Sequence, residues 1–232
     1  ELLTGRLSGV LTRQTSSLPG SDNTQISIRG YGDPLVIVDG IQMDFSRIDP
    51  NDIESVSVLK DAAAAVYGAR AGNGVILVNT KRGKIGKPTI QYHGTYTTQE
   101  ATAFLDHVNA GDWATLFREA QLNLGLPPEL SEEEVQNYVN EVPGYESYDW
   151  PGELIKNFAP MHQHNISLDG GNERVRYYAS VGYIDQESIF RSRDFDYTRY
   201  NARTNIDLVI TDKISFSFDL AYQKDLTDYA NP

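Results

Sequence analysis

The feature that most constrains the fold of this chain is an alternation of apolar and polar residues in its C-terminal third. The pattern occupies residues 175–183, 199–208 and 214–222, where Ile, Leu, Phe, Tyr and Val alternate largely with polar or small residues. A period of two indicates β-strands, because successive side chains of a strand point to opposite faces. The sequence therefore predicts a sheet with one apolar and one polar face.

The connections between these strands differ in length. Residues 170–173 and 211–213 are short turns, whereas residues 185–196 form a longer, charged connection. Short turns at one end and long loops at the other are typical of outer-membrane β-barrels. With the segments at 88–98 and from 164 onward we expect about five strands, whereas a barrel with a plugged lumen has about 22. Five strands cannot close, so this sheet should keep exposed edges.

Residues 54–79 predict a compact strand–helix–strand unit upstream of the sheet. Val and Ser alternate at 55–58, which indicates a half-buried strand, and the apolar run at 75–78 indicates a strand covered on both faces. Between them, Asp61 is expected to cap a short helix that ends at Gly68.

Shorter elements precede this unit. Leucines at amphipathic spacing predict a helix over residues 1–11, and residues 25–29 and 35–38 read as strands. We therefore expect one compact mixed α/β unit up to residue 83. Residue 1 falls inside the helical pattern, and the chain stops directly after a strand-like segment, so we also expect it to be a piece of a longer protein.

An interruption of the strand pattern spans about residues 103–159. Apolar residues at steps of three and four predict an amphipathic helix from about Trp113 to Leu124. Ser131 and Glu134 form a capping box for a second helix. Because the segment is long for a structureless loop, we expect a folded surface insertion.

Three aromatic residues of this insertion are candidate ligand contacts: Tyr145, Tyr148 and Trp150. Such rings could stack on sugars or hold a peptide. Packing of the insertion against itself explains them equally well.

Composition excludes some functions. The formal net charge of −12 argues against nucleic-acid binding, which needs clustered Lys and Arg. No stretch approaches 18 consecutive apolar residues, so no transmembrane helix is predicted. A membrane is not excluded, because a transmembrane β-strand alternates apolar and polar residues over about 10 positions. The chain has no cysteine, which leaves its redox compartment open.

No constellation of catalytic residues stands out, so we expect neither an enzyme nor a cofactor. His162 and His164 could share one face of a strand, but no third metal ligand follows at a diagnostic spacing. The glycines at 68, 72 and 74 lack the GKS or GKT sequence of a phosphate-binding loop and are better explained as turn residues.

Several spaced motifs resemble one known family. VLKDAAAAVYGARAGNGVILVNTKRG, with IRGYGDPLVIVDG upstream, resembles the plug domain of TonB-dependent outer-membrane transporters of the SusC/RagA branch. PMHQHNISLDGGNERVRYYASVGYIDQESIF and RYNARTNIDLVI are similar to the first barrel hairpins of that branch. The resemblance covers residues 26–83 densely and resumes at 160–205.

The resemblance implies a fold in two parts. Residues 1–84 would be an N-terminally truncated α/β plug domain, a small mixed sheet with short helices. Residues 85–232 would begin an antiparallel transmembrane β-barrel, with about five strands and a long helical extracellular loop at about 100–160. The barrel would be incomplete in this chain.

The resemblance also implies a function and a location. The whole protein would import a large nutrient, a glycan or peptide, across the outer membrane of a Gram-negative, Bacteroidota-like bacterium. TonB would energise import through a segment outside this chain, and a SusD-like lipoprotein would form an extracellular lid. The barrel would face outer-membrane lipid, and the plug would gate its lumen.

Arg29 and Arg70 are the candidate contacts between plug and barrel, because each neighbours a glycine in a plug-like motif. We expect them to pair with acidic groups of the barrel wall, although an arginine is often simply exposed.

An alternative function is that of a soluble β-rich binding or adhesion module with an α/β cap. That alternative requires the tyrosine and phenylalanine faces of the strands to pack into a dry core.

Overall fold

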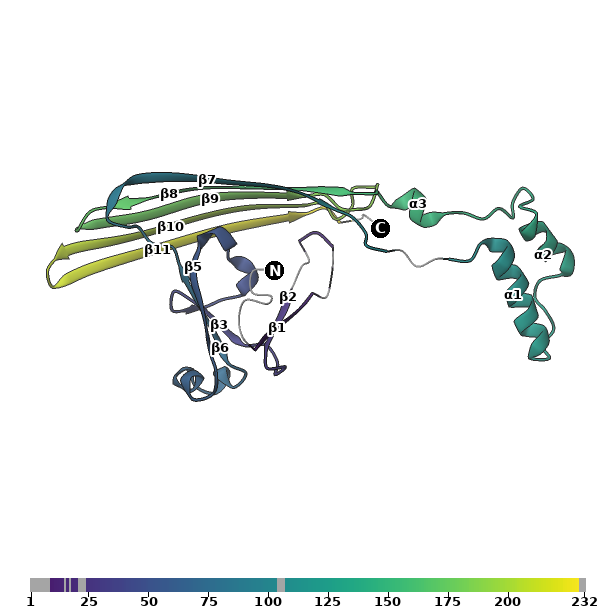
Figure 1. Cartoon of the computed structure of the whole chain (residues 1–232), viewed down its shortest axis with the longest axis horizontal. Helices are drawn as coiled ribbons and strands as arrows, with labels where there is room; N and C mark the ends of the chain where they lie inside the picture. Colours follow the sequence, from purple (N-terminus) through teal and green to yellow (C-terminus); the bar gives the residue numbers. More distant parts are fainter. Residues whose placement is uncertain (1–8, 15, 17, 21–23, 104–106, 230–232) are drawn as a thin grey trace. The chain divides into compact units, whose positions relative to one another are not determined.

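The computed structural model describes residues 9–14, 16, 18–20, 24–103 and 107–229 (Figure 1). These residues fall into two compact units. The first comprises residues 1–99, 159–188 and 193–232, and the second comprises residues 100–158 and 189–192.

The N-terminal region of the first unit, residues 9–84, contains two small sheets. The strands β1 (Val10–Gln14) and β2 (Thr24–Ile28) pair antiparallel. The second sheet has the order β4-β3-β6-β5, in which β3 and β6 are parallel and the other pairs antiparallel. Its strands are β3 (Leu35–Val38), β4 (Ile41–Gln42), β5 (Ile53–Leu59) and β6 (Val75–Thr80). This is the small mixed sheet that the sequence predicted.

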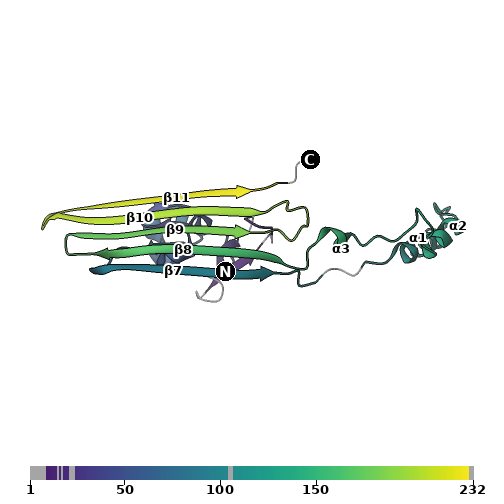
Figure 2. The same cartoon turned by 90° about the horizontal axis from the view of Figure 1, so that it is seen from above.

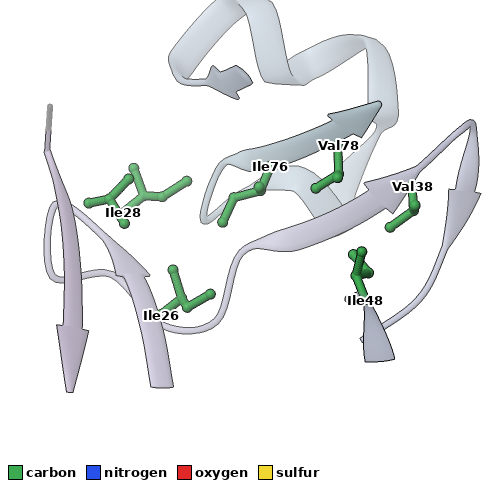
Figure 3. Close-up of a cluster of buried hydrophobic side chains, with 7 residues drawn as sticks. Ile26, Ile28, Val38, Ile48, Ile76 and Val78 are labelled. Atoms are coloured by element: carbon green, nitrogen blue, oxygen red, sulfur yellow. The ribbon is translucent and has the colours of Figure 1, made fainter. Parts of the chain in front are cut away.

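Strand β6 lies at the centre of this sheet, between β3 and β5. Val75, Ile76 and Val78 are almost fully buried, as the continuous apolar run predicted. Ile76 and Val78 belong to one core cluster with Val10, Ile26, Ile28, Val38 and Ile48, and Figure 3 labels all of these residues except Val10. Val75 belongs to a second cluster, with Ile37, Ala64 and Ala71.

Short 3₁₀ turns connect these strands: η1 (Phe45–Arg47), η2 (Pro50–Asp52), η3 (Asp61–Tyr67) and η4 (Ala69–Ala71). The predicted cap at Asp61 is wrong. Lys60 precedes η3 without a side-chain cap, and Asp61 is its first residue, with φ of 55°. The predicted stop at Gly68 is confirmed, since its φ of 75° suits glycine.

The predicted N-terminal helix is wrong at its end, because Val10 and Leu11 belong to β1. Residues 1–8 lie outside the described residues. The apolar spacing of residues 1–11 misled the prediction because Val10 is buried through pairing with Ile28 rather than along a helical face.

The long sheet of the first unit has five antiparallel strands in the order β11-β10-β9-β8-β7, side by side in Figure 2. The strands are β7 (Gly86–Gln99), β8 (Ala159–Gly171), β9 (Val175–Gln186), β10 (Tyr197–Thr211) and β11 (Ile214–Thr227). Short turns at 172–174 and 212–213 join neighbouring strands at one end.

The two faces of the long sheet differ in chemistry, as the alternation predicted. One face is apolar and stays largely open, with Phe218 45% exposed and Val181 55% exposed. The opposite face is polar, and its central side chains are buried: Asn165, Ser167, Ser180, Asn201, Arg203 and Asn205. Buried polar groups need hydrogen-bond partners. The polar face therefore determines where the N-terminal region contacts the long sheet.

The second unit contains α1 (Ala110–Asn123), α2 (Glu132–Val139) and α3 (Trp150–Leu154). The predicted capping box is present at α2, where the Ser131 side chain accepts from the Glu134 backbone. The Glu134 carboxylate accepts from the Ser131 backbone N–H, and this bond lowers the pKa of Glu134. Among the described helices, none has the length and apolar character needed to cross a membrane.

Candidate functional site

The register of the long sheet arranges its polar face in rows that cross the strands. Asn165, Gly182 and Asn201 are direct neighbours on β8, β9 and β10. The next row holds Ser167, Ser180 and Arg203. These rows receive three carboxylates of the N-terminal region, Asp39, Asp49 and Asp52. We use the name polar seat for the residues of these two rows and the three carboxylates, together with Tyr178, Asn205 and Thr80.

Asp49 enters the first row. Its Oδ2 accepts hydrogen bonds from Asn201 Nδ2 at 2.8 Å and Asn165 Nδ2 at 3.2 Å. Its Oδ1 accepts from the backbone and side chain of Asn51 at 2.8 and 3.0 Å, which fixes the turn that carries it. Asp49 is only 7% exposed.

Gly182 makes room for this contact. A Cβ atom at Gly182 would lie 2.6 Å from Asn201 Nδ2 and 2.7 Å from Asp49 Oδ2. Because real Cβ atoms do not approach neighbours so closely, any other residue would force the Asn201 amide and the Asp49 carboxylate apart or out of position. The glycine is therefore a notch in the sheet that accepts one carboxylate.

Asp52 lies deeper, with 2% of its surface exposed. Its Oδ1 accepts hydrogen bonds from Ser180 Oγ at 2.6 Å and Tyr178 Oη at 2.9 Å. Burial raises the pKa of Asp52, because the ionised carboxylate loses its hydration, and the neighbouring Asp49 adds to the rise. The two hydroxyls and Arg203 oppose that rise.

Arg203 is the cation of the polar seat. Its guanidinium lies 3.4 Å from Asp52 Oδ2 and 3.7 Å from Asp39 Oδ2, and it is 6% exposed. It also donates to Thr80 Oγ1 at 3.5 Å, and Asn205 donates to the same oxygen at 3.0 Å. One arginine of β10 therefore contacts three separate segments of the N-terminal region.

A second ionic contact lies at the end of the N-terminal region. Arg82 pairs with Asp207 of β10 at 2.9 Å and with Asp219 of β11 at 2.6 Å. These side chains are partly exposed, so solvent weakens the pair relative to the polar seat. Arg82 ties the link between the N-terminal region and β7 to the long sheet.

A cavity of about 1190 Å³ opens between the N-terminal region and the long sheet. Met43, Phe45 and Arg47 line it on one side, and Gln163 and Tyr197 line it on the other. The lining mixes amides, aromatic rings and paired charges, which suits a polar ligand.

The two arginines singled out from the sequence have partners within the N-terminal region. Arg29 pairs with Asp61 at 3.0 Å, and Arg70 donates to Gln42 Oε1 at 3.3 Å. Both contacts are exposed, and neither partner belongs to the long sheet. Pairing of Arg29 and Arg70 with acidic groups of a barrel wall stays a prediction.

The three aromatic residues lie in the second unit. Tyr148 and Trp150 are neighbours, with ring centroids 4.6 Å apart, and both are largely exposed. Tyr145 instead packs edge-on against Tyr138 at 4.9 Å. Packing within the insertion thus accounts for Tyr145 and leaves Tyr148 and Trp150 available to a ligand.

The histidines form no metal centre with their neighbours. His164 Nδ1 lies 2.7 Å from Tyr92 Oη on the apolar face of the long sheet. In the described part of the chain, no three His, Cys, Asp or Glu residues are placed to hold a metal ion.

Sequence reasoning missed the residues of the polar seat. Asp39, Asp49 and Asp52 occupy turns, where aspartate is expected on local grounds alone. A signal was nevertheless present: Asn201, Arg203 and Asn205 place a charge and two amides on one face of a strand whose other face is apolar. Such a face needs a polar partner.

Comparison with known proteins identifies the two parts. Residues 1–75 match the TonB-dependent Receptor Plug Domain family. The whole chain is 30% identical to TonB-dependent receptor SusC of Bacteroides thetaiotaomicron, over 23% of that protein. It is also 30% identical to TonB-dependent receptor P26 of Formosa agariphila, again over the whole chain and 24% of the relative.

A solved structure gives the same result. The RagAB peptide importer in its open-open state superposes with a TM-score of 0.77 and 29% identity, over 98% of this chain and 28% of that chain. The chain thus spans about a quarter of the length of these relatives. The N-terminal region therefore has the fold of a TonB-dependent receptor plug domain, the long sheet has the antiparallel strands of a partial barrel, and the chain as a whole is similar to TonB-dependent receptors of the SusC and RagA type.

Proposed function

We propose that the protein to which this chain belongs imports a large nutrient, a glycan or peptide, across the outer membrane of a Gram-negative bacterium. TonB supplies the energy, and the plug gates the barrel lumen. The observation that carries this proposal is the polar seat: the plug is held on the inner face of the wall by buried hydrogen bonds and charge pairs.

A polar seat suits a plug that must move. Water can replace each hydrogen bond when the plug is displaced, whereas an apolar interface would expose its surface to water at a large cost. The plug then has a docked and a displaced state, and ligand affinity must differ between them for transport to be vectorial. The cavity of about 1190 Å³ beside the seat offers a ligand direct contact with the plug.

The partners follow from the same family. We propose that TonB pulls on a segment that precedes the plug, and that a SusD-like lipoprotein covers the extracellular opening. The likeness to TonB-dependent receptor SusC and to the RagAB peptide importer supports both partners.

The alternative, a soluble binding module, needed a dry core between the aromatic faces of the strands. Phe216 and Phe218 remain about half exposed, and Tyr222 is 58% exposed, on the apolar face. That face suits contact with lipid, so we favour the membrane protein.

The proposal is tested by purifying the full-length protein from its native outer membrane in detergent and identifying the co-purifying proteins by mass spectrometry. We expect a stoichiometric lipoprotein, whose own ligand preference indicates the substrate class. Recovery in the soluble fraction without detergent would refute the proposal.

We propose that Arg29 and Arg70 contact acidic groups of the remaining barrel wall. Substituting both with Ala should loosen the plug and lower nutrient uptake, because each lost ion pair leaves a carboxylate unpaired. Uptake and protease resistance of the plug are measured in the full-length receptor. Arg13→Ala, an exposed change in β1, is the control. Unchanged plug retention and uptake in the double variant would contradict this role.

We also propose that Tyr148 and Trp150 contact the ligand, with Tyr145 in support. Replacing both exposed rings with Ala should weaken binding about 5- to 150-fold, as expected for loss of one or two stacking contacts of about 1–3 kcal/mol in total. Ligand titration of the full-length receptor measures this. Tyr145→Ala should destabilise the insertion rather than act on the ligand directly. Equal affinities of the double variant and the wild type would refute a ligand contact.

A further inference from the structure

The polar seat contains more negative than positive charge. Asp39, Asp49 and Asp52 converge on it from the plug, and Arg203 is the guanidinium that reaches two of them. Tyr178 of the wall also faces Asp52, and Arg47 and Asp225 line the same cavity as Asp49 and Asp52. Arg82 adds a more distant attraction to Asp39. Two buried negative charges are therefore incompletely balanced, which is costly in a site shielded from water.

The three carboxylates differ in the hydrogen bonds that would stabilise their ionised forms. Asp49 accepts four hydrogen bonds from Asn51, Asn165 and Asn201. Asp39 accepts two, at 3.0 and 2.6 Å, from Thr80. Asp52 receives both of its hydroxyl donors on Oδ1. For Oδ2, the contact recorded among the described residues is Arg203 Nε at 3.4 Å, which is long for a charged hydrogen bond.

The wall around the seat also has buried polar atoms without a hydrogen-bond partner, and among the described residues one of them is the donor Arg203 Nε. Within the described residues, the buried oxygens Asn201 Oδ1 and Asn205 Oδ1 accept no hydrogen bond. Both side chains are at least nine-tenths buried. The seat thus combines a poorly satisfied carboxylate oxygen with amide oxygens that lack a donor. A proton on the Asp52 carboxylate removes one excess negative charge from the seat.

We propose that docking of the plug binds a proton from solvent at the Asp52 carboxylate, so that the polar seat is a proton-linked latch. The carboxylate and the proton form a neutral acid in the docked state, and the acid returns its proton to water when the plug leaves the wall. This inference rests on the proposed function, in which the plug has a docked and a displaced state.

The direction of the effect follows from the chemistry of Asp52. Docking raises its pKa above the ordinary aspartate value of about 3.9. A raised pKa stabilises docking fully below the ordinary value, and this contribution is lost as pH rises through the docked value. The latch should therefore hold most tightly in mild acid and loosen towards alkaline pH.

The first test is an infrared titration of the full-length receptor in detergent. The wild type should show a protonated carboxyl band that disappears with a midpoint above about pH 3.9. Asp52→Asn should lack this band, and Asp212→Asn, an exposed change in the β10–β11 turn, should keep it. A midpoint at or below the ordinary value, or a band retained in Asp52→Asn, would overturn the proposal.

The second test measures plug docking itself, as the urea concentration that makes the plug sensitive to protease. The wild-type urea midpoint should decrease as pH rises through the raised, docked pKa of Asp52, whereas the midpoint of Asp52→Asn, which stays neutral, should not. Ser180→Ala removes one donor to the ionised form, so it should move the wild-type pH dependence upwards. Identical pH profiles for all three proteins would refute the latch.

Uptake separates this inference from the proposed function. If no nutrient uptake is found but the Asp52 band and the pH dependence of docking are present, the import proposal fails and the latch stands. If uptake is normal and independent of Asp52, with no carboxyl band, the latch fails and the import proposal stands.

Discussion

Replacing Arg203 with Met should release the plug. Methionine keeps much of the side-chain length but removes the charge that contacts Asp39 and Asp52. Removing one partner of a buried ion pair costs about 3–5 kcal/mol, because the remaining charge stays buried without compensation. The midpoint of urea-induced plug release in the full-length receptor should fall accordingly, and the plug should become sensitive to protease in the absence of urea.

Two further variants test whether a buried carboxylate left without its cation causes the release of the plug. Arg174→Met removes an exposed arginine from the turn between β8 and β9, and should leave docking unchanged. Adding Asp39→Asn and Asp52→Asn to Arg203→Met should recover much of the loss, because the two carboxylates that Arg203 contacts are then neutral. A midpoint for Arg203→Met that equals the wild-type value would show that the seat does not hold the plug.

A methyl group at Gly182 should displace the plug from its register. In Gly182→Ala the new Cβ would meet Asp49 Oδ2 at 2.7 Å and both polar atoms of the Asn201 amide. Overpacking of this kind costs about 1–3 kcal/mol, and loss of the bonds to Asp49 adds about 1.5–3 kcal/mol. Hydrogen exchange should show faster exchange in residues 49–52 and in the plug strands that follow them.

The control for this variant is Gly72→Ala. Gly72 has a helical φ of −56°, and a Cβ there would lie 3.5 Å from the Ala69 carbonyl oxygen, an ordinary contact. Its exchange rates should match those of the wild type. Unchanged exchange at residues 49–52 in Gly182→Ala would mean that the notch does not position Asp49.

The strands could be predicted because the pattern of apolar and polar residues in each of them follows directly from which of its faces are buried. The period of two in residues 199–208 follows from a polar face and an apolar face, and β10 has both. The apolar run at 75–78 follows from burial on both faces of β6. The capping box at Ser131 and Glu134 is local in sequence, so it too could be found without a structure.

The seat could not be predicted because it depends on register. Asn165, Gly182 and Asn201 form one row only when three strands pair as they do, and their spacing along the chain does not reveal it. Asp49 caps its own turn through Asn51, so a structural role explained it without any distant partner. The role of Gly182 could not be predicted, because a glycine within a strand is first interpreted as a residue that weakens the strand.

The helix predicted for residues 1–11 shows a different limit. Its leucine spacing fits an amphipathic helix, yet Val10 and Leu11 pair with Ile28 and Ser27 in a sheet. A few apolar residues fit either period, and tertiary pairing decides between them. The prediction for Asp61 failed for a similar reason: its side chain pairs with Arg29, a residue distant in sequence, instead of capping the turn that follows.

Ion conductance in planar lipid bilayers tests most directly whether the plug closes the lumen of a barrel by docking on its wall. The full-length wild-type protein should insert and conduct almost no current, whereas a variant that lacks residues 1–84 should conduct through an open pore. Gly182→Ala and Arg203→Met should conduct at an intermediate level. Equal conductance of the wild type and the plug-deleted variant would contradict the account.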